Sequence, residues 1–176
     1  MQSYEISLLP IGDDISVLDL QILSKKLAKT FSVINPKITV LNCVEIPKRS
    51  YNPHRKQFLV DHFIKIISLS PGNKALGITT VDLYTPDLNF IFGQAEINGK
   101  SCVISLNRLK QGALRNLFVS RAVKEAVHEL GHTFGLKHCL DKFCVMHFSN
   151  CLADTDLKGE DFCDICKKKF ILRGNS

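Results

Sequence analysis

The segment HELGHTFGLKH is the feature that most constrains this chain. On a helix, residues four apart lie on one face, so His128 and His132 can bind one metal ion. Glu129, next to His128, can reach a metal-bound water without being a ligand. Gly135 can adopt a left-handed conformation that ends the helix and turns the chain, which would bring His138 to the same ion. Three protein ligands leave a fourth position for water, as in a catalytic zinc site.

Two pairs of cysteines and a methionine follow this motif. They are Cys139, Cys144, Cys163 and Cys166, with Met146 after the first pair. Four thiolates complete a tetrahedral zinc site with no open position, so we expect this second zinc to be structural. A C-x-x-C pair is also typical of redox motifs, but the presence of the first pair favours metal binding. Cys151, between the two pairs, is an alternative ligand.

The histidine motif resembles the signature of the metzincin clan of zinc peptidases, in which a methionine turn lies below the metal. With the four cysteines and Met146, the resemblance narrows to the archaemetzincin family, which combines this motif with a second zinc held by four cysteines. Segments 77–82 and 89–95 also look like strands of that family, so the resemblance covers about half of the chain. It implies that Met146 forms the turn below the catalytic zinc.

Hydrophobic periodicity predicts an α/β fold. Strands are expected at 4–10, 38–44, 76–84, 90–97 and 102–106, and helices at 16–34, 53–69 and 114–134. Their alternation favours a mostly parallel sheet, and Asn98-Gly99 indicates a hairpin with one antiparallel strand. The metzincin resemblance implies an α+β arrangement with a mixed, twisted five-stranded sheet on helices and an antiparallel edge strand beside the cleft. On the last helix, the expected solvent face carries Arg115, Arg121, Lys124 and Glu125.

The composition fits one domain in a reducing compartment. The chain has 176 residues, of which 45% are hydrophobic, and this is enough for one core. We expect a single metallopeptidase domain over residues 1–176, with a sheet and helix part to about 135 and a small zinc-stabilised part from about 136. Neither a membrane span nor a signal peptide is evident, so a cytoplasmic location is expected. Disulfides are not expected there, and Cys43, Cys102 and Cys151 are interpreted as core thiols.

These features predict a zinc-dependent metallopeptidase with two zinc ions, acting as a monomer on a peptide or protein substrate. Zinc lowers the pKa of a bound water, and Glu129 would act as the general base that takes its proton. The substrate would add as a strand to the edge near residues 89–97. The net charge of +6 and the basic run at 167–169 are interpreted as a solvated tail, so neither nucleic acid nor a membrane is an expected partner.

Three alternatives stay open at this point. Glu160 would replace His138 as the third ligand if the site resembled that of thermolysin-like enzymes. A catalytically silent or latent zinc-binding module for protein or nucleic acid is the second alternative, with His147 or Tyr51 in the open metal position. The third is hydrolysis of a non-peptide amide, which the same zinc and water chemistry would serve.

Overall fold

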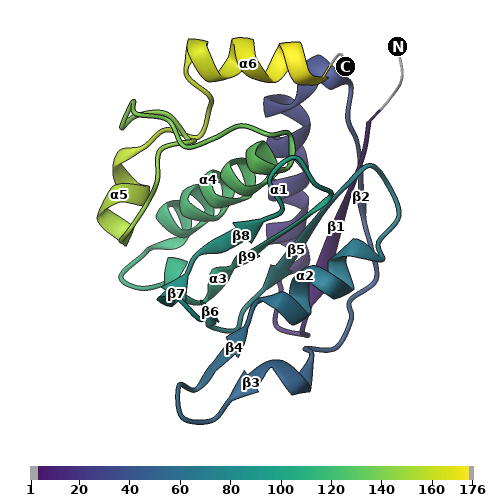
Figure 1. Cartoon of the computed structure of the whole chain (residues 1–176), viewed down its shortest axis with the longest axis vertical. Helices are drawn as coiled ribbons and strands as arrows, with labels where there is room; N and C mark the ends of the chain where they lie inside the picture. The colour runs from purple at the N-terminus through teal and green to yellow at the C-terminus, as the bar shows by residue number, and fades with distance from the viewer. Residues whose placement is uncertain (1–3, 175–176) are drawn as a thin grey trace.

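The computed structural model describes residues 4–174, and a mixed five-stranded sheet lies at its centre (Figure 1). The sheet runs in the order β2 (Lys37–Val40), β1 (Glu5–Ile11), β5 (Lys74–Thr79), β9 (Ser101–Ser105) and β8 (Gly93–Ala95). The first four strands are parallel, and β8 pairs antiparallel with β9 at the edge. The predicted sheet is therefore confirmed. Residues 1–3, the start of the segment in which a signal peptide would lie, are outside the described residues.

A second, four-stranded sheet was not predicted. Its strands, in spatial order, are β3 (Tyr51–Asn52), β4 (Gln57–Leu59), β6 (Leu83–Thr85) and β7 (Leu88–Ile91). The helix predicted at 53–69 is consequently wrong in its first half, because α2 covers only Asp61–Ser68. Before it, the chain turns with Lys56 in the left-handed region at φ 54°, and β4 then pairs with β6.

Two of the predicted strands are each divided between the two sheets. The segment 76–84 leaves the central sheet after Thr79 and joins the second sheet at Leu83, and the segment 90–97 crosses back between Ile91 and Gly93. A hydrogen bond holds the first crossing, since the Ser105 hydroxyl donates to the carbonyl of Val81 at 2.6 Å. Such crossings depend on tertiary contacts, so periodicity within a short apolar run does not reveal them.

Helices cover both faces of the central sheet. The helices besides α2 are α1 (Val17–Thr30), α3 (Leu106–Leu109), α4 (Arg115–Thr133), α5 (Leu152–Leu157) and α6 (Asp164–Gly174), with short 3-10 turns at Ser32–Ile34 and Lys48–Ser50. Alternate residues of β1 belong to two cores: Ile6 and Leu8 pack with α1 and α4, whereas Leu9 and Ile11 pack with α2. Figure 1 shows α2 in front of the sheet and α1 behind it.

Helix α4 is more deeply buried than its sequence predicts. Arg121, Lys124 and Glu125, expected at the solvent face, are only 4%, 6% and 3% exposed. The segment around α5 covers them and supplies the opposite charges. The Arg121 guanidinium lies 2.6 Å from the Asp156 carboxylate, and Lys158 Nζ lies 3.1 Å from that of Glu125. Residues from about 136 onward therefore pack on α4 as part of one core.

Two further expectations concern solvent exposure. Of the three cysteines interpreted as core thiols, Cys102 is buried, but Cys43 and Cys151 are exposed, so for these two the interpretation is wrong. Cys43 lies in a loop, where its thiol donates to the carbonyl of Gly12 at 3.4 Å, and Cys151 is the N-cap of α5, where its thiol donates to the Asp154 carboxylate at 3.4 Å. None of the helices in residues 4–174 combines the length and the apolar character that crossing a membrane requires.

Candidate active site and metal centres

Helix α4 carries two of the three predicted imidazoles and ends at the predicted glycine. Gly135 has φ 80°, the left-handed conformation that the sequence predicts for it. Its N–H donates to the carbonyl of His132 at 2.8 Å, and the N–H of Leu136 donates to the carbonyl of Gly131 at 3.0 Å. These two bonds form a Schellman motif, which ends a helix and reverses the chain. The reversal returns His138 to the face of the helix that carries His132.

The three imidazoles converge on one point. The ring centroids of His128, His132 and His138 are 4.6 to 5.4 Å apart, and each ring offers a nitrogen within 4.8 Å of the others. Nδ1 of His128 lies 2.8 Å from the carbonyl of Val145, and Nδ1 of His132 lies 2.7 Å from that of Leu136. A carbonyl only accepts hydrogen bonds, so Nδ1 of each ring carries the proton and Nε2 keeps its lone pair. The two Nε2 atoms lie 3.0 Å apart, and their lone pairs can bind a metal ion.

The electrostatic surroundings keep these rings neutral. Burial lowers the pKa of His128 far below its ordinary range, and the charge of Lys158 lowers it further. Burial is also the largest cause of the lowered pKa values of His132 and His138. Zinc binds the neutral imidazole, so a low pKa removes competition from protons. The chemistry of this group of residues therefore fits a zinc ion.

Glu129 lies beside the imidazoles and is only 6% exposed. Burial raises the pKa of its carboxyl well above the ordinary range, the charge of Glu125 raises it further, and Lys158 opposes the shift. The edge strand β8 passes close to this carboxyl at Gly93. A β-carbon added to Gly93 would lie 2.7 Å from Cγ of Glu129. A buried carboxyl with a raised pKa suits the exchange of protons near neutral pH.

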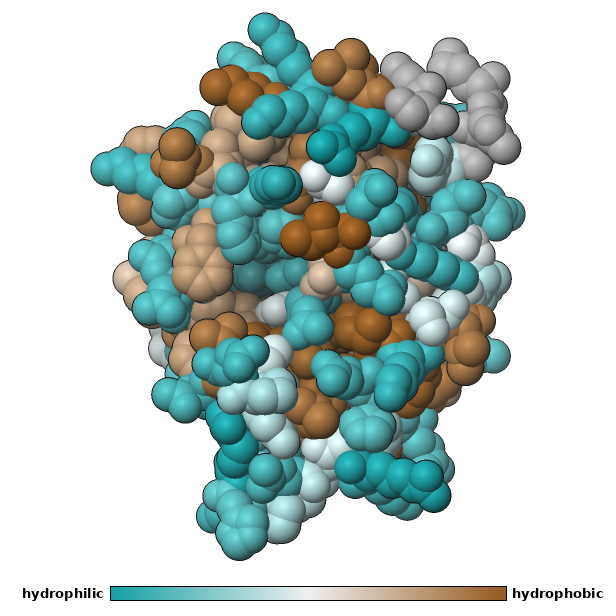
Figure 2. Space-filling model, in the orientation of Figure 1, coloured by the Kyte–Doolittle hydropathy of each residue, from teal (hydrophilic) through white to brown (hydrophobic). Residues whose placement is uncertain are grey.

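A cleft of about 830 Å³ opens over these groups. Strands β7 and β8 form one wall, the C-terminal half of α4 forms the floor, and the loop at 148–150 forms the other wall. The Phe148 ring lies beside that of His138, with centroids 5.1 Å apart. The surface is hollowed left of centre in Figure 2, where hydrophilic and hydrophobic residues both border the hollow. The cleft gives a substrate access to the imidazoles and to Glu129.

Met146 is fully buried. Its sulfur packs on α4 at Gly131, where the helix has no side chain. A β-carbon added to Gly131 would lie 2.5 Å from this sulfur. The adjacent Val145 supplies the carbonyl next to the His128 ring. The loop that contains Met146 therefore fixes the orientation of one imidazole through its backbone and the position of the helix through its side chain.

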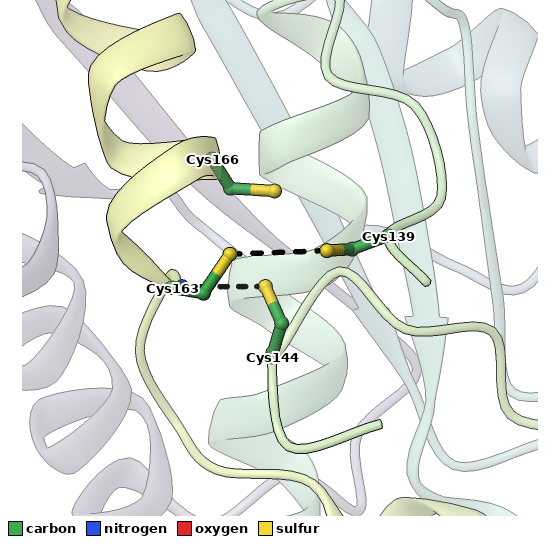
Figure 3. Close-up of side chains that lie close together, drawn as sticks. All are labelled: Cys139, Cys144, Cys163 and Cys166. Atoms are coloured by element: carbon green, nitrogen blue, oxygen red, sulfur yellow. Dashed lines mark hydrogen bonds between the residues drawn. The ribbon is translucent and has the colours of Figure 1, made fainter. Parts of the chain in front are cut away.

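The four predicted cysteines form a second cluster. Their sulfur atoms lie within 4.8 Å of one another. In Figure 3, Cys139 and Cys144 extend from the loop after α4 towards Cys163 and Cys166 at the start of α6. Burial raises the pKa of Cys144 to about 11, whereas hydrogen bonds, chiefly from the backbone N–H of Cys166, outweigh burial and lower the pKa of Cys163. Four thiols this close, unpaired as disulfides, suit a tetrahedral zinc ion.

The two clusters are mechanically linked. Cys139 directly follows His138, and its N–H donates to the carbonyl of Met146 at 2.9 Å. The carbonyl of Cys139 in turn lies 2.9 Å from Nδ1 of His147. One loop thus joins the third imidazole, the methionine turn and the first cysteine.

Residues named in the alternative interpretations lie elsewhere. Glu160 binds Lys26 at 2.9 Å and Ser120 at 2.8 Å, and it does not belong to the group formed by the three imidazoles. Tyr51 packs on Phe58 in the second sheet, with ring centroids 4.9 Å apart. The ring of His147 is held by the backbone of the cysteine loop. The position of Glu160 favours His138 as the third ligand.

Sequence reasoning missed Gly93, Glu125 and Lys158 at this site. Glu125 carries a signal, since it lies four residues before Glu129 and therefore on the same face of the helix. No local pattern marks Lys158, which reaches α4 only through the tertiary fold. Gly93 is recognisable only once β8 is known to pass over Glu129.

Comparisons with known proteins point to one peptidase family. A model of peptidase family M54 matches residues 49–171. The archaemetzincin of Methanocaldococcus jannaschii is 39% identical over 174 residues, which cover 96% of this chain and 94% of that protein. The archaemetzincin of Pyrococcus furiosus is 39% identical over 93% of this chain and 91% of its own.

Solved structures show the same similarity. The crystal structure of archaemetzincin from Methanopyrus kandleri superposes with a TM-score of 0.90 at 31% identity, covering 98% of this chain and 96% of that chain. That of Archaeoglobus fulgidus archaemetzincin, complexed with malonate, gives a TM-score of 0.83 at 36% identity, covering 94% and 99%. From its sequence, its fold and the family match, this chain belongs to the archaemetzincins of peptidase family M54 and is a zinc metallopeptidase.

Proposed function

We propose that His128, His132 and His138 bind the catalytic zinc and that Glu129 is the general base for hydrolysis of peptide bonds. The convergence of three neutral imidazoles beside a buried carboxyl, at the floor of an open cleft, is the observation that carries this proposal. When bound, zinc supplies the Lewis acidity that activates a water molecule and polarises the substrate carbonyl.

Glu129 carries the proton between the two halves of the reaction. Its carboxylate accepts the proton of the attacking water, and the resulting carboxylic acid returns this proton to the leaving amine. Burial raises the pKa of Glu129 well above its ordinary range, which makes its carboxylate a stronger base for the first step. The crowding by Gly93 limits the positions that the carboxyl can occupy.

The edge strand β8 is the proposed binding site for the substrate backbone. It pairs with β9 on one side, and its residues line the cleft. An extended peptide can add to such an edge by main-chain hydrogen bonds, which are independent of side-chain identity. This geometry would place a peptide bond across the imidazoles.

We further propose that Cys139, Cys144, Cys163 and Cys166 bind a second, structural zinc. Four thiolates leave no open coordination position, so this ion would hold the loop after α4 against α6. A cluster of free thiols is stable in a reducing compartment, which supports a cytoplasmic enzyme. The shared core of α4 and α5 supports a single domain over residues 1–176, and we propose that it acts as a monomer.

Elemental analysis combined with peptide cleavage tests this proposal. Wild type and Glu129→Gln should each contain two zinc ions, His138→Ala should contain one, and both variants should lose cleavage of a mixed peptide library. Wild-type rates in Glu129→Gln would exclude the general base, and two zinc ions in His138→Ala would exclude the third ligand. Two zinc ions without cleavage by wild type would instead favour a binding module.

A further inference from the structure

The proposed mechanism gives a buried ion pair at the cleft no contact with the substrate. Glu125 lies one helical turn before Glu129, is 3% exposed and lines the cleft. Lys158 has a fully buried side chain, and its Nζ lies 3.1 Å from Oε1 of Glu125. The Thr155 hydroxyl donates to the same oxygen at 3.4 Å. Removing two charges from water opposes folding, so this pair is costly to keep for stability alone.

The pair leaves hydrogen-bonding capacity at the cleft. Within residues 4–174, both contacts of the Glu125 carboxylate are made by Oε1, which leaves Oε2 as an acceptor. Ser149 also lines the cleft, and its buried hydroxyl has no hydrogen-bond partner in the same part of the chain. The buried Ser149 hydroxyl costs free energy while it has no partner, and a ligand that supplies a partner recovers this free energy.

We propose that Glu125, held in place by Lys158, is a specificity-determining residue that selects a hydrogen-bond-donating side chain next to the scissile bond. This inference rests on the proposed function, because that function places the scissile bond at the imidazoles. Four helical residues span about 6 Å along the axis, so Glu125 is within reach of a side chain that flanks a bond held beside Glu129.

The chemistry of the pair defines the class of side chain. An ionised carboxylate only accepts hydrogen bonds, so the incoming group must donate. Lys158 already balances its charge, which favours the neutral amides of asparagine and glutamine and the hydroxyls of serine and threonine over cations. An aliphatic side chain would exclude water from Glu125 and Ser149 but could not replace the hydrogen bonds that this water makes. A site with polar groups left unpaired in this way discriminates strongly against such a side chain.

A peptide series tests this selection with the zinc-loaded, full-length enzyme. The probes are acetylated, amidated hexapeptides of alanine in which one central residue, on either side of the scissile bond, is glutamine, leucine or lysine. The variant Glu125→Leu/Lys158→Met removes both charges at similar volume. The matched control Arg121→Met/Asp156→Leu removes the neighbouring ion pair, whose residues are absent from the cleft lining that residues 4–174 form.

Wild type and the control should favour glutamine over leucine by at least about tenfold in kcat/KM, with lysine below glutamine. The preference should disappear in Glu125→Leu/Lys158→Met. Should that variant fail to fold, Glu125→Gln, which offers an amide in place of a carboxylate, should reduce the preference for glutamine. An unchanged preference in the folded variant, or a wild-type preference for leucine, would overturn the inference.

Binding separates this inference from the proposed catalytic function. Calorimetric titration of the same peptides into zinc-loaded Glu129→Gln requires no turnover and should show the same order of affinities. Equal affinities for all peptides, including the absence of measurable binding, would overturn the selection by Glu125. The proposed catalytic function is tested separately. Metal content tests the zinc ligands, and the loss of cleavage in Glu129→Gln tests the general base.

Discussion

Gly93 lies so close to Glu129 that a β-carbon on the glycine would be 2.7 Å from both Cγ and Oε1 of the glutamate. The same β-carbon would lie 2.7 Å from the carbonyl of Val103 on the neighbouring strand. Two sides of this position are therefore closed, one by the sheet and one by the proposed general base. The edge strand that is expected to bind substrate also fixes the position of the base.

Substitution of Gly93 by alanine should displace the Glu129 carboxyl and reduce kcat. Misplacement of a catalytic group by about 1 Å costs on the order of 100-fold in rate, so we expect a loss of about 10- to 100-fold at unchanged zinc content. Gly112→Ala is the control, because no heavy atom lies within 4 Å of an added β-carbon there; its φ of 62° adds local backbone strain, so it should lose some stability but keep wild-type kcat. Wild-type kcat in Gly93→Ala would show that the contact does not constrain the base.

The metal-free enzyme should lose stability as the pH falls below the ordinary imidazole value of 6.5. Folding lowers the pKa of His128 and His132, so the folded chain keeps these rings neutral while the unfolded chain takes up protons. The stability that these two rings contribute is therefore fully present above pH 6.5. It is lost as the pH falls from 6.5 through their lowered pKa values. Urea unfolding of chelator-treated protein between about pH 8 and pH 5 measures it.

The variant His128→Asn/His132→Asn isolates the contribution of these rings. It should lose less stability over the same pH range than wild type, because its asparagines do not titrate. Contributions from the cysteines and other titrating groups are shared by the two proteins and cancel in the difference. Parallel curves for the two proteins would contradict the prediction.

Loss of the cysteine-bound zinc should weaken the catalytic site. Cys139 follows His138 directly, and the loop between the clusters carries Met146. We expect Cys163→Ser to lower the zinc content at both sites, as measured by elemental analysis after dialysis against a weak chelator. Cys43→Ser, which alters an exposed thiol away from both clusters, is the control. Full occupancy of the imidazole site in Cys163→Ser would contradict the proposed linkage.

The ion pair of Glu125 and Lys158 should be strongly coupled in stability. Lys158→Met alone leaves a buried carboxylate without its partner, which we expect to lower the free energy of unfolding by about 3 kcal/mol. Glu125→Leu/Lys158→Met replaces both charges by apolar groups and should lose less than that single variant. Urea unfolding of the two single variants and the double variant gives the coupling. Additive losses would show that the two charges do not interact.

The sequence alone determined the proposed ligands, because their geometry is mostly local. His128 and His132 face one side of a helix through its periodicity, and Gly135 makes the turn that the left-handed conformation requires. The hairpin at Asn98-Gly99 and a mixed, mostly parallel sheet were likewise predictable from turn chemistry and alternation, and the family resemblance implied that the sheet has five strands. The helix face, the glycine turn and the hairpin each depend on residues a few positions apart.

The tertiary structure alone decided which neighbours complete the site. The second sheet divides apolar runs that look like continuous strands, and pairing of β8 with β9 at the edge of the central sheet places Gly93 against Glu129. Lys158 reaches Glu125 from a segment more than thirty residues away and converts an expected solvent face into a buried one. Burial and long-range charge pairing depend on the packing of whole elements, so periodicity within one element does not contain them.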